Sequence, residues 1–128
     1  MSDEQRFESR RLALQASLDA AKTQAERNRL GQFATPTDLA TDMLAYARDL
    51  LLPATRVRFL DPGFGTGSFY SALLRTFPSD QVAAAEGFEI DPHYSMPTAQ
   101  LWHGTSLILR LAVDTRSTRS PTANPQII

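Results

Sequence analysis

A strand followed by three alternate glycines constrains the fold of this chain more than any other feature. In the stretch from Arg56 to Phe69, a short β-prone apolar run ends at Asp61, and glycines follow at Gly63, Gly65 and Gly67 before a helix-like segment. Glycine suits a turn that needs positive φ or a close approach of a ligand, because it has no Cβ. A strand, a glycine turn and a helix predict a nucleotide-type binding site. A carboxylate at the start of that turn favours a cationic or hydrogen-bond-donating ligand group over a bare phosphate.

Length and composition restrict the class of protein to which the chain can belong. The 128 residues allow one domain with a modest core. There is no apolar run near the roughly 20 residues of a membrane span and no signal-peptide pattern, so we expect a cytoplasmic protein without membrane contact. The chain has no cysteine, and His93 and His103 are not spaced with acids into a metal site, so no metal is expected. A net charge of −1 lacks the basic character of a self-sufficient nucleic-acid binder.

Helical patterns fill the N-terminal part. Apolar residues at three- and four-residue spacing predict a helix over residues 4–30, which we interpret as a surface helix packed on a domain and ended by Gly31. Thr35 as N-cap and Pro36 in the first turn then predict a second helix that runs to about Leu51. Four arginines of the first helix are expected on a solvated face: Arg10, Arg11, Arg27 and Arg29.

A second acid ends the next predicted strand. After a helix over residues 68–77, expected to bury Phe69, Leu73 and Leu74, a strand over residues 82–90 contains Glu89 near its end. Ligands of βαβ units bind outside the carboxyl ends of parallel strands, so Asp61 and Glu89 should face one crevice. An acid at this second position is the usual acceptor for ribose hydroxyls. Residues 94–102 and 107–113 are predicted as a further helix and strand, and the strand is followed by Asp114.

The glycine spacing restricts the ligand. A phosphate-binding P-loop needs a lysine after its last glycine, and the only lysine is Lys22. A dinucleotide fingerprint needs its third glycine three residues after the second, where this chain has Ser68. The pattern therefore favours a nucleoside ligand that carries an amino acid.

Three segments resemble one enzyme family. The segment from Asp61 to Phe69 (Asp-Pro-Gly-Phe-Gly-Thr-Gly-Ser-Phe) resembles the S-adenosylmethionine-binding motif I of class I methyltransferases, in the form found in the adenine-specific DNA methyltransferases of restriction-modification systems. Gly31 to Pro36 (Gly-Gln-Phe-Ala-Thr-Pro) resembles motif X, and Gly87 to Pro92 (Gly-Phe-Glu-Ile-Asp-Pro) resembles motif II. The three segments occur in the family's order.

The resemblance implies an α/β fold: a partial Rossmann-like, doubly wound methyltransferase domain (residues 31–114). The helical pattern makes residues 1–30 an N-terminal helical segment before it, and residues 115–128, rich in Ser, Thr, Arg and Pro without periodicity, are expected to be an irregular or disordered tail. The resemblance also implies that Asp61 accepts from the methionine ammonium group and that Glu89 accepts from the ribose hydroxyls. Ile90 would pack on the adenine, and Asp114 would accept from the adenine amino group. The implied S-adenosylmethionine-binding residues are Phe33, Thr35, Pro36, Asp61, Pro62, Gly63, Gly65, Gly67, Phe69, Glu89, Ile90 and Asp114.

The family's catalytic motif is missing. The motif Asn/Asp/Ser-Pro-Pro-Tyr/Phe orients the flipped base, and the chain contains no such tetrapeptide, so no catalytic residue is assigned. The segment 124–127 (Asn-Pro-Gln-Ile) begins correctly but lacks the second proline and the aromatic residue. The chain has residues for about three strands, where such domains have roughly seven.

We therefore interpret the chain as the cofactor-binding part of a DNA methyltransferase, truncated or frameshifted, inactive alone, with double-stranded DNA bound by the missing part. Without the family's fourth strand, the strand over residues 57–60 becomes a sheet edge that invites pairing with another chain. Two alternatives stay open. One is a split-enzyme or regulatory subunit that binds cofactor and pairs with a second chain, and the other is a methyltransferase that acts on RNA or protein.

Overall fold

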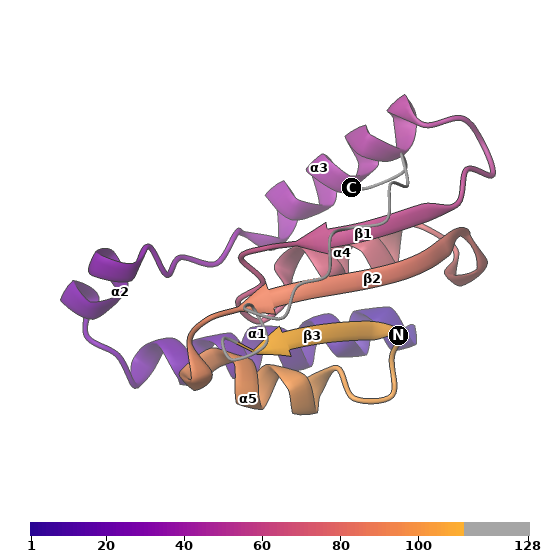
Figure 1. Cartoon of the computed structure of the whole chain (residues 1–128). Coiled ribbons are helices and arrows are strands. Elements are labelled where there is room, and N and C mark those ends of the chain that lie inside the picture. The colour runs from indigo at the N-terminus through magenta and orange to yellow at the C-terminus, as the bar shows by residue number, and fades with distance from the viewer. Residues whose placement is uncertain (112–128) are drawn as a thin grey trace.

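The computed structural model of the chain describes residues 1–111, which form a mixed α/β arrangement (Figure 1). Asp114 and residues 115–128 lie outside the described residues, so the predictions made for them stay predictions. The elements in chain order are α1 (Asp3–Ala20), α2 (Gln24–Leu30), α3 (Thr37–Leu50), β1 (Val57–Asp61), α4 (Ser68–Thr76), a 3-10 turn (Ser79–Gln81), β2 (Val82–Glu89), α5 (Pro92–Leu101) and β3 (Leu107–Leu111).

The sheet is parallel, with strand order β1-β2-β3. Asp61 pairs with Gly87, and Gly87 pairs with Leu109, so the carboxyl ends of the three strands lie at the same edge of the sheet. Within residues 1–111 no strand pairs with the outer side of β1. The expectation that the first strand lies at the sheet edge is therefore confirmed for the described part of the chain.

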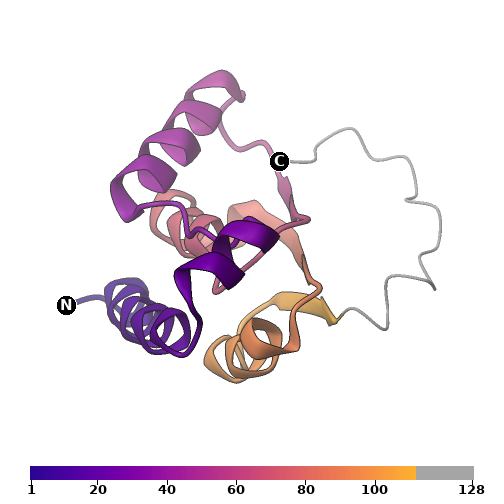
Figure 2. The ribbon, with the colours of Figure 1, turned by 90° about the vertical axis from the view of Figure 1, so that its left-hand side faces the viewer.

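Helices α4 and α5 pack on one face of the sheet, α1 packs on both of these helices, and α3 packs on α4 (Figures 1 and 2). Helix α2 lies beyond the carboxyl ends of the strands (Figure 1). Side chains of β1 alternate accordingly: Val57 and Phe59 are buried toward the helices, whereas Leu60 is exposed. On β3, Ile108 is exposed. No described helix covers this second face (Figure 2).

Aromatic contacts join α1 to the core. Phe7 stacks on Trp102 with ring centroids 5.1 Å apart, and Tyr70 meets the edge of Trp102 at 4.9 Å. Tyr70, Leu73 and Phe77 are buried on the inner side of the α4 region. Of the three residues of this helix predicted to be buried, Leu73 is fully buried, whereas Phe69 and Leu74 are only partly buried and pack against the core from its margin.

The predicted single helix over residues 4–30 is also wrong, because it is interrupted between Ala20 and Gln24. Thr23 starts α2 with a capping box: its hydroxyl accepts from the Glu26 N–H at 3.1 Å, and the Glu26 carboxylate accepts from the Thr23 N–H at 3.2 Å. This Thr-x-x-Glu signal is visible in the sequence. Gly31 ends α2 in the left-handed region with φ 65°, as predicted.

Two helix starts differ from the predictions. Pro36 occupies the N-cap of α3 in an extended conformation, so α3 begins at Thr37 and Thr35 makes no cap hydrogen bond. Helix α5 begins at Pro92 because Asp91 caps it by accepting from the His93 N–H at 3.0 Å. Among residues 1–111, the helices all fall short of the length or apolar character that crossing a membrane requires.

Candidate functional site

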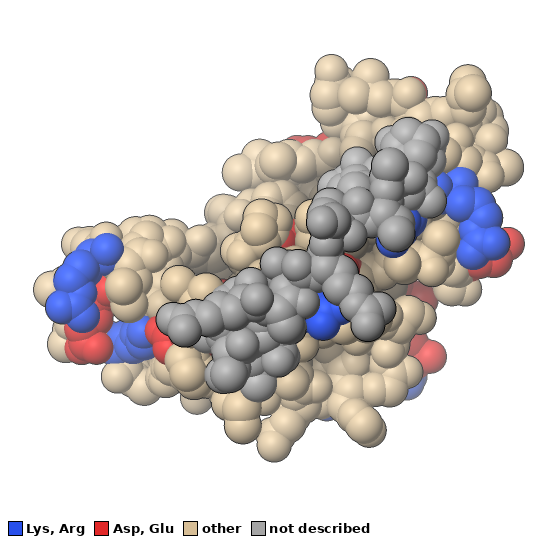
Figure 3. All heavy atoms as spheres, viewed as in Figure 1, with Lys and Arg blue, Asp and Glu red and all other residues tan. Residues whose placement is uncertain are grey.

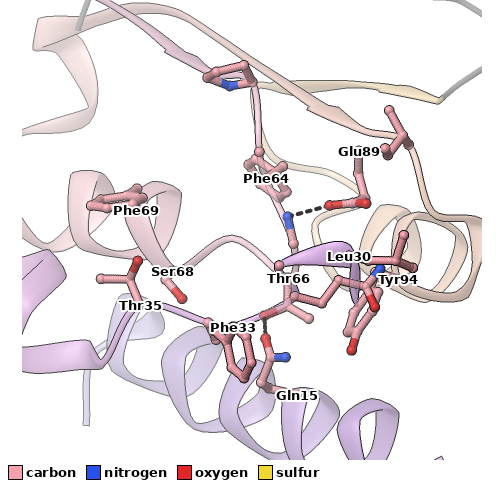
Figure 4. Close-up of a pocket in the computed structure, with 17 residues that line it drawn as sticks. Gln15, Leu30, Phe33, Thr35, Phe64, Thr66, Ser68, Phe69, Glu89 and Tyr94 are labelled. Atoms are coloured by element: carbon pink, nitrogen blue, oxygen red, sulfur yellow. Dashed lines mark hydrogen bonds between the residues drawn. The ribbon is translucent and has the colours of Figure 1, made fainter. Parts of the chain in front are cut away.

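A cavity of about 260 Å³ lies where the carboxyl ends of β1 and β2 meet the glycine turn and the loop before α3 (Figure 4). Most of the residues expected at the cofactor site line it: Phe33, Thr35, Pro62, Gly63, Gly65, Phe69, Glu89 and Ile90. Three of the expected residues do not line the cavity: Pro36, Asp61 and Gly67. Each of them is directly adjacent in sequence to a residue that does. Asp114 lies outside the described residues. The three motif-like segments are thus brought to one place.

The glycine turn needs two of its three glycines for conformational reasons. Gly65 and Gly67 have φ of 60° and 100°. A Cβ on Gly67 would lie 2.8 Å from Trp102 Nε1 and 2.9 Å from the Phe64 ring. Gly63 has neither constraint, and a Cβ there would meet no atom within 4 Å. Gly63 is therefore a place where a ligand can approach the backbone.

Glu89 ties the end of β2 to the glycine turn. Its Oε1 accepts from the Gly65 N–H at 2.9 Å, and its Oε2 accepts from the Asp91 N–H at 2.9 Å (Figure 4). A carboxylate has about four acceptor positions, so each oxygen keeps one for a further donor. Glu89 is thus fixed in orientation and still able to accept from a ligand.

Asp61 has a buried carboxylate oxygen without a partner. Its Oδ1 accepts from the Gly63 N–H at 3.0 Å, whereas Oδ2 is buried and has no hydrogen-bond partner in the described residues. Burial raises the pKa of Asp61, the negative charge of Glu89 adds to this, and the Gly63 hydrogen bond opposes it. A buried unpartnered acceptor is unfavourable in isolation, and a cationic donor would stabilise it.

A polar cluster that the sequence analysis missed supports the turn from α1. We name it the Arg11 cluster; it consists of Glu8, Arg11, Thr66 and Ser68. Arg11 is 1% exposed, which shows that its placement on a solvated face is wrong. Its Nη1 donates to Thr66 Oγ1 at 3.2 Å and to Ser68 Oγ at 3.0 Å, and its Nε and Nη2 donate to the Glu8 carboxylate.

A sequence signal for this cluster exists. Arg11 lies four residues after Phe7 and three before Leu14, so it occupies the same helix face as the apolar residues that pack inward. Glu8, one turn earlier, supplies its counter-charge, and Arg75 Nη2 of α4 also donates to Glu8 Oε2 at 3.3 Å. The cavity is further lined by nine residues that were not predicted to bind the cofactor: Gln15, Leu30, Gly31, Gln32, Ala34, Phe64, Thr66, Ser68 and Tyr94.

A second polar network holds the loop before α3 to the start of α5. Lys22 pairs with Asp91 and donates to Gln32 Oε1 at 2.7 Å, and Gln32 Nε2 donates to Asp91 Oδ2 at 2.6 Å. Burial alone would raise the pKa of Asp91, but the hydrogen bonds from Lys22, Gln32 and the His93 N–H lower it to about 2. This Lys22 network keeps the loop over the cavity.

The comparisons with known proteins provide no family assignment. No protein-family model matches the chain, and no solved structure gives a significant match. Within residues 1–111, no group of three or more His, Cys, Asp or Glu side chains is placed to hold a metal ion. In Figure 3, Lys and Arg side chains lie beside acidic ones at both ends of the visible face, and further ones border the grey residues; those that are visible form no broad basic surface.

Proposed function

We propose that this chain is the S-adenosylmethionine-binding portion of an adenine-specific DNA methyltransferase, and that it is inactive alone. The observation that carries the proposal is the cavity at the carboxyl ends of β1 and β2, where the glycine turn, Glu89 and the loop with Phe33 meet. Ligands of open parallel sheets bind at such a place. The proposal also depends on the three motif-like segments, since no family model and no solved structure matches the chain.

The residues present fit the polar groups of S-adenosylmethionine. Asp61 does not itself line the cavity but directly precedes Pro62, which does; its Oδ2, buried and unpartnered in the described residues, would accept from the ammonium group. Glu89 would accept from the ribose hydroxyls through the positions that its two backbone hydrogen bonds leave free. Ile90 and Phe33 line the cavity and are 70% and 57% exposed, so they could cover the adenine as an apolar rim. Asp114 would complete the adenine contact.

When bound, S-adenosylmethionine supplies the methyl group for transfer to the amino group of adenine. This chain's part is to bind and orient the cofactor. The residues that orient the target base, and most contacts to double-stranded DNA, would belong to a part of the enzyme that this sequence does not contain.

Titration calorimetry of the purified chain with S-adenosylmethionine and with NAD tests the proposal. We expect binding of S-adenosylmethionine and weaker or no binding of NAD, because Ser68 replaces the third glycine of a dinucleotide turn. Tighter binding of NAD would contradict it. The chain alone should transfer no methyl group to adenine-containing duplex DNA. Methyl transfer by the isolated chain would overturn the part of the proposal that says the chain is inactive alone.

A second candidate function is a split-enzyme subunit that binds cofactor and completes its sheet with another chain. The outer edge of β1 carries no strand in residues 1–111, and the outer face of α3 exposes a row of apolar side chains. Such an edge favours pairing with another polypeptide. Sedimentation velocity distinguishes the two: a monodisperse, well-folded monomer over a wide concentration range would contradict the subunit.

A further inference from the structure

The buried Arg11 determines which way the hydroxyls of the glycine turn form hydrogen bonds. An arginine side chain has donors only, so Thr66 Oγ1 and Ser68 Oγ must both accept from Arg11 Nη1. Each hydroxyl then has a single hydrogen left to donate elsewhere. Because Arg11 is itself held by the Glu8 carboxylate, this direction is fixed by the fold.

The hydroxyl hydrogens of Thr66 and Ser68 have different surroundings. The Thr66 hydroxyl donates to Gln15 Oε1 at 2.5 Å, and the amide of Gln15 is held in that orientation because its Nε2 donates to Asp19 Oδ1 at 2.9 Å (Figure 4). The Ser68 hydroxyl has no acceptor among the described residues. Ser68 is 7% exposed, and it lines the cavity together with Phe33 and Thr35 of the loop before α3 (Figure 4). Ser68 is therefore a buried donor directed by Arg11 and left for a ligand.

We propose that Arg11, held by Glu8, is a positioning residue that makes Ser68 a hydrogen-bond donor to the carboxylate of an amino-acid-bearing ligand in the cavity. Ser68 is also the first residue of α4, where free backbone N–H groups favour a negative charge. Asp61, at the other end of the turn, would take the ammonium group of the same amino acid. This inference rests on the proposed function for the identity of the ligand.

The experiment is a double-mutant cycle in titration calorimetry with two ligands, S-adenosylmethionine and 5′-methylthioadenosine, which lacks the amino-acid carboxylate. Ser68→Ala should weaken S-adenosylmethionine binding by roughly ten- to a hundred-fold, as for a lost hydrogen bond to a charged group. It should leave 5′-methylthioadenosine binding unchanged. Equal weakening of both ligands, or of neither, would overturn the contact between Ser68 and the carboxylate.

The positioning role is tested in the variant E8Q/R11M, which removes the charges of Glu8 and Arg11 together so that neither is left without the other. Arg75, which also donates to Glu8, keeps its hydrogen bonds to Thr41 Oγ1 and the Ser71 carbonyl oxygen. S-adenosylmethionine should bind to it about as weakly as to Ser68→Ala, and adding Ser68→Ala to it should cause little further loss, since coupled residues are not additive. Additive losses would overturn the positioning role. Arg6→Met on the exposed side of α1, where Arg6 pairs with Asp3, is the matched control and should change neither affinity.

A ligand-free readout separates this inference from the proposed function. Trp102, the only tryptophan, donates from its indole N–H to the Thr66 carbonyl oxygen at 2.8 Å, so its fluorescence reports the glycine turn. E8Q/R11M should shift this emission in a protein that is still folded by circular dichroism, and Arg6→Met should not. If the natural chain binds neither ligand, the proposed function and the Ser68 contact fail together. The positioning role then stands if the emission shifts and is overturned if it does not.

Discussion

The underside of the glycine turn and the outer face of α3 have opposite distributions of polarity. In the Arg11 cluster, a charged side chain is 1% exposed and fully paired. Along the outer face of α3, four apolar side chains at helical spacing are about half exposed or more: Leu39 (51%), Met43 (48%), Tyr46 (66%) and Leu50 (69%). We call these four residues the α3 stripe.

The contrast indicates which part of the fold is complete. Buried polar groups are stable only when their partners are present, and the donors of Arg11 find their acceptors in Glu8, Thr66 and Ser68. A contiguous exposed apolar surface next to an open sheet edge is typical of a surface that another polypeptide covers. The support of the glycine turn is thus complete within the described residues, and the β1 side of the sheet is not. Substitutions near the cavity should change stability or binding, and substitutions in the α3 stripe should change association alone.

The largest effect is expected at Gly67. Gly67→Ala forces a side chain into φ 100° and places a Cβ 2.8 Å from Trp102 Nε1, so the free energy of unfolding should fall by about 2–5 kcal/mol. Urea denaturation followed by circular dichroism measures this. Gly63→Ala is the matched control, because its Cβ meets no atom within 4 Å. It should change stability by less than about 1 kcal/mol while weakening S-adenosylmethionine binding. Equal stability losses in the two variants would contradict the conformation of the turn.

A smaller effect, on binding alone, is expected at Asp61. Asp61→Asn removes the negative charge that would accept from the ligand ammonium, so affinity for S-adenosylmethionine should fall at least about ten-fold. The free energy of unfolding should change by less than about 1 kcal/mol, since one unpartnered polar atom replaces another. Calorimetry and urea denaturation at neutral pH separate these two quantities.

The raised pKa of Asp61 gives this variant a pH signature. Burial, chiefly, keeps the proton on Asp61 at a higher pH than on an ordinary aspartate. In the natural chain, affinity should therefore decline on acidification before the pH reaches the ordinary aspartate value of 3.8, and in Asp61→Asn this decline should be absent. The same pH profile in both proteins would show that Asp61 does not bind the ligand.

The Lys22 network should contribute less to the free energy of unfolding than the conformation at Gly67. Lys22→Met removes the cation from a pair whose side chains are 11% and 17% exposed, so the free energy of unfolding at pH 7 should fall by about 1–2 kcal/mol. Because the folded-state pKa of Asp91, about 2, lies below its ordinary value of 3.8, this stabilisation is present above pH 3.8 and is lost as the pH falls toward 2. The difference between natural and Lys22→Met stabilities should shrink over that range. Arg48→Met, at an exposed pair, should show no such pH dependence.

The sequence predicted the strands and the position of the cavity better than it predicted the side-chain contacts that hold the glycine turn in place. Strand β1 begins at Val57 and β2 at Val82 as expected, because apolar runs and turn residues are local signals. The cavity lies at the predicted crevice, since the carboxyl ends of neighbouring parallel strands must meet at one edge of a sheet. Both predictions depend on patterns within a few residues.

The side-chain contacts that hold the glycine turn were harder to predict, because part of them joins residues far apart in the chain. Arg11 was expected in solvent, since arginine is rarely buried; its burial depends on the Glu8 carboxylate on the same helix and on contacts 55 and 57 residues away, with Thr66 and Ser68. Gly87 was seen only as part of a motif, yet a Cβ on it would lie 2.3 Å from the ring of Phe64. Such packing arises when the glycine turn folds over β2.

The smallest effect on stability is expected in the α3 stripe. Exposed side chains contribute little to folding, so the double variant Met43→Lys and Leu50→Lys should change the free energy of unfolding by no more than about 0.5 kcal/mol. Affinity for S-adenosylmethionine should also be unchanged, because neither residue lines the cavity. Sedimentation velocity should show less concentration-dependent association than in the natural chain, since charges on an apolar surface oppose its burial against another chain. A matched variant on another exposed helix surface, Ala16→Lys, should leave association unaltered. If the stripe variant instead unfolds the protein or weakens ligand binding, α3 belongs to the locally complete part of the fold, and the contrast between the two regions does not hold.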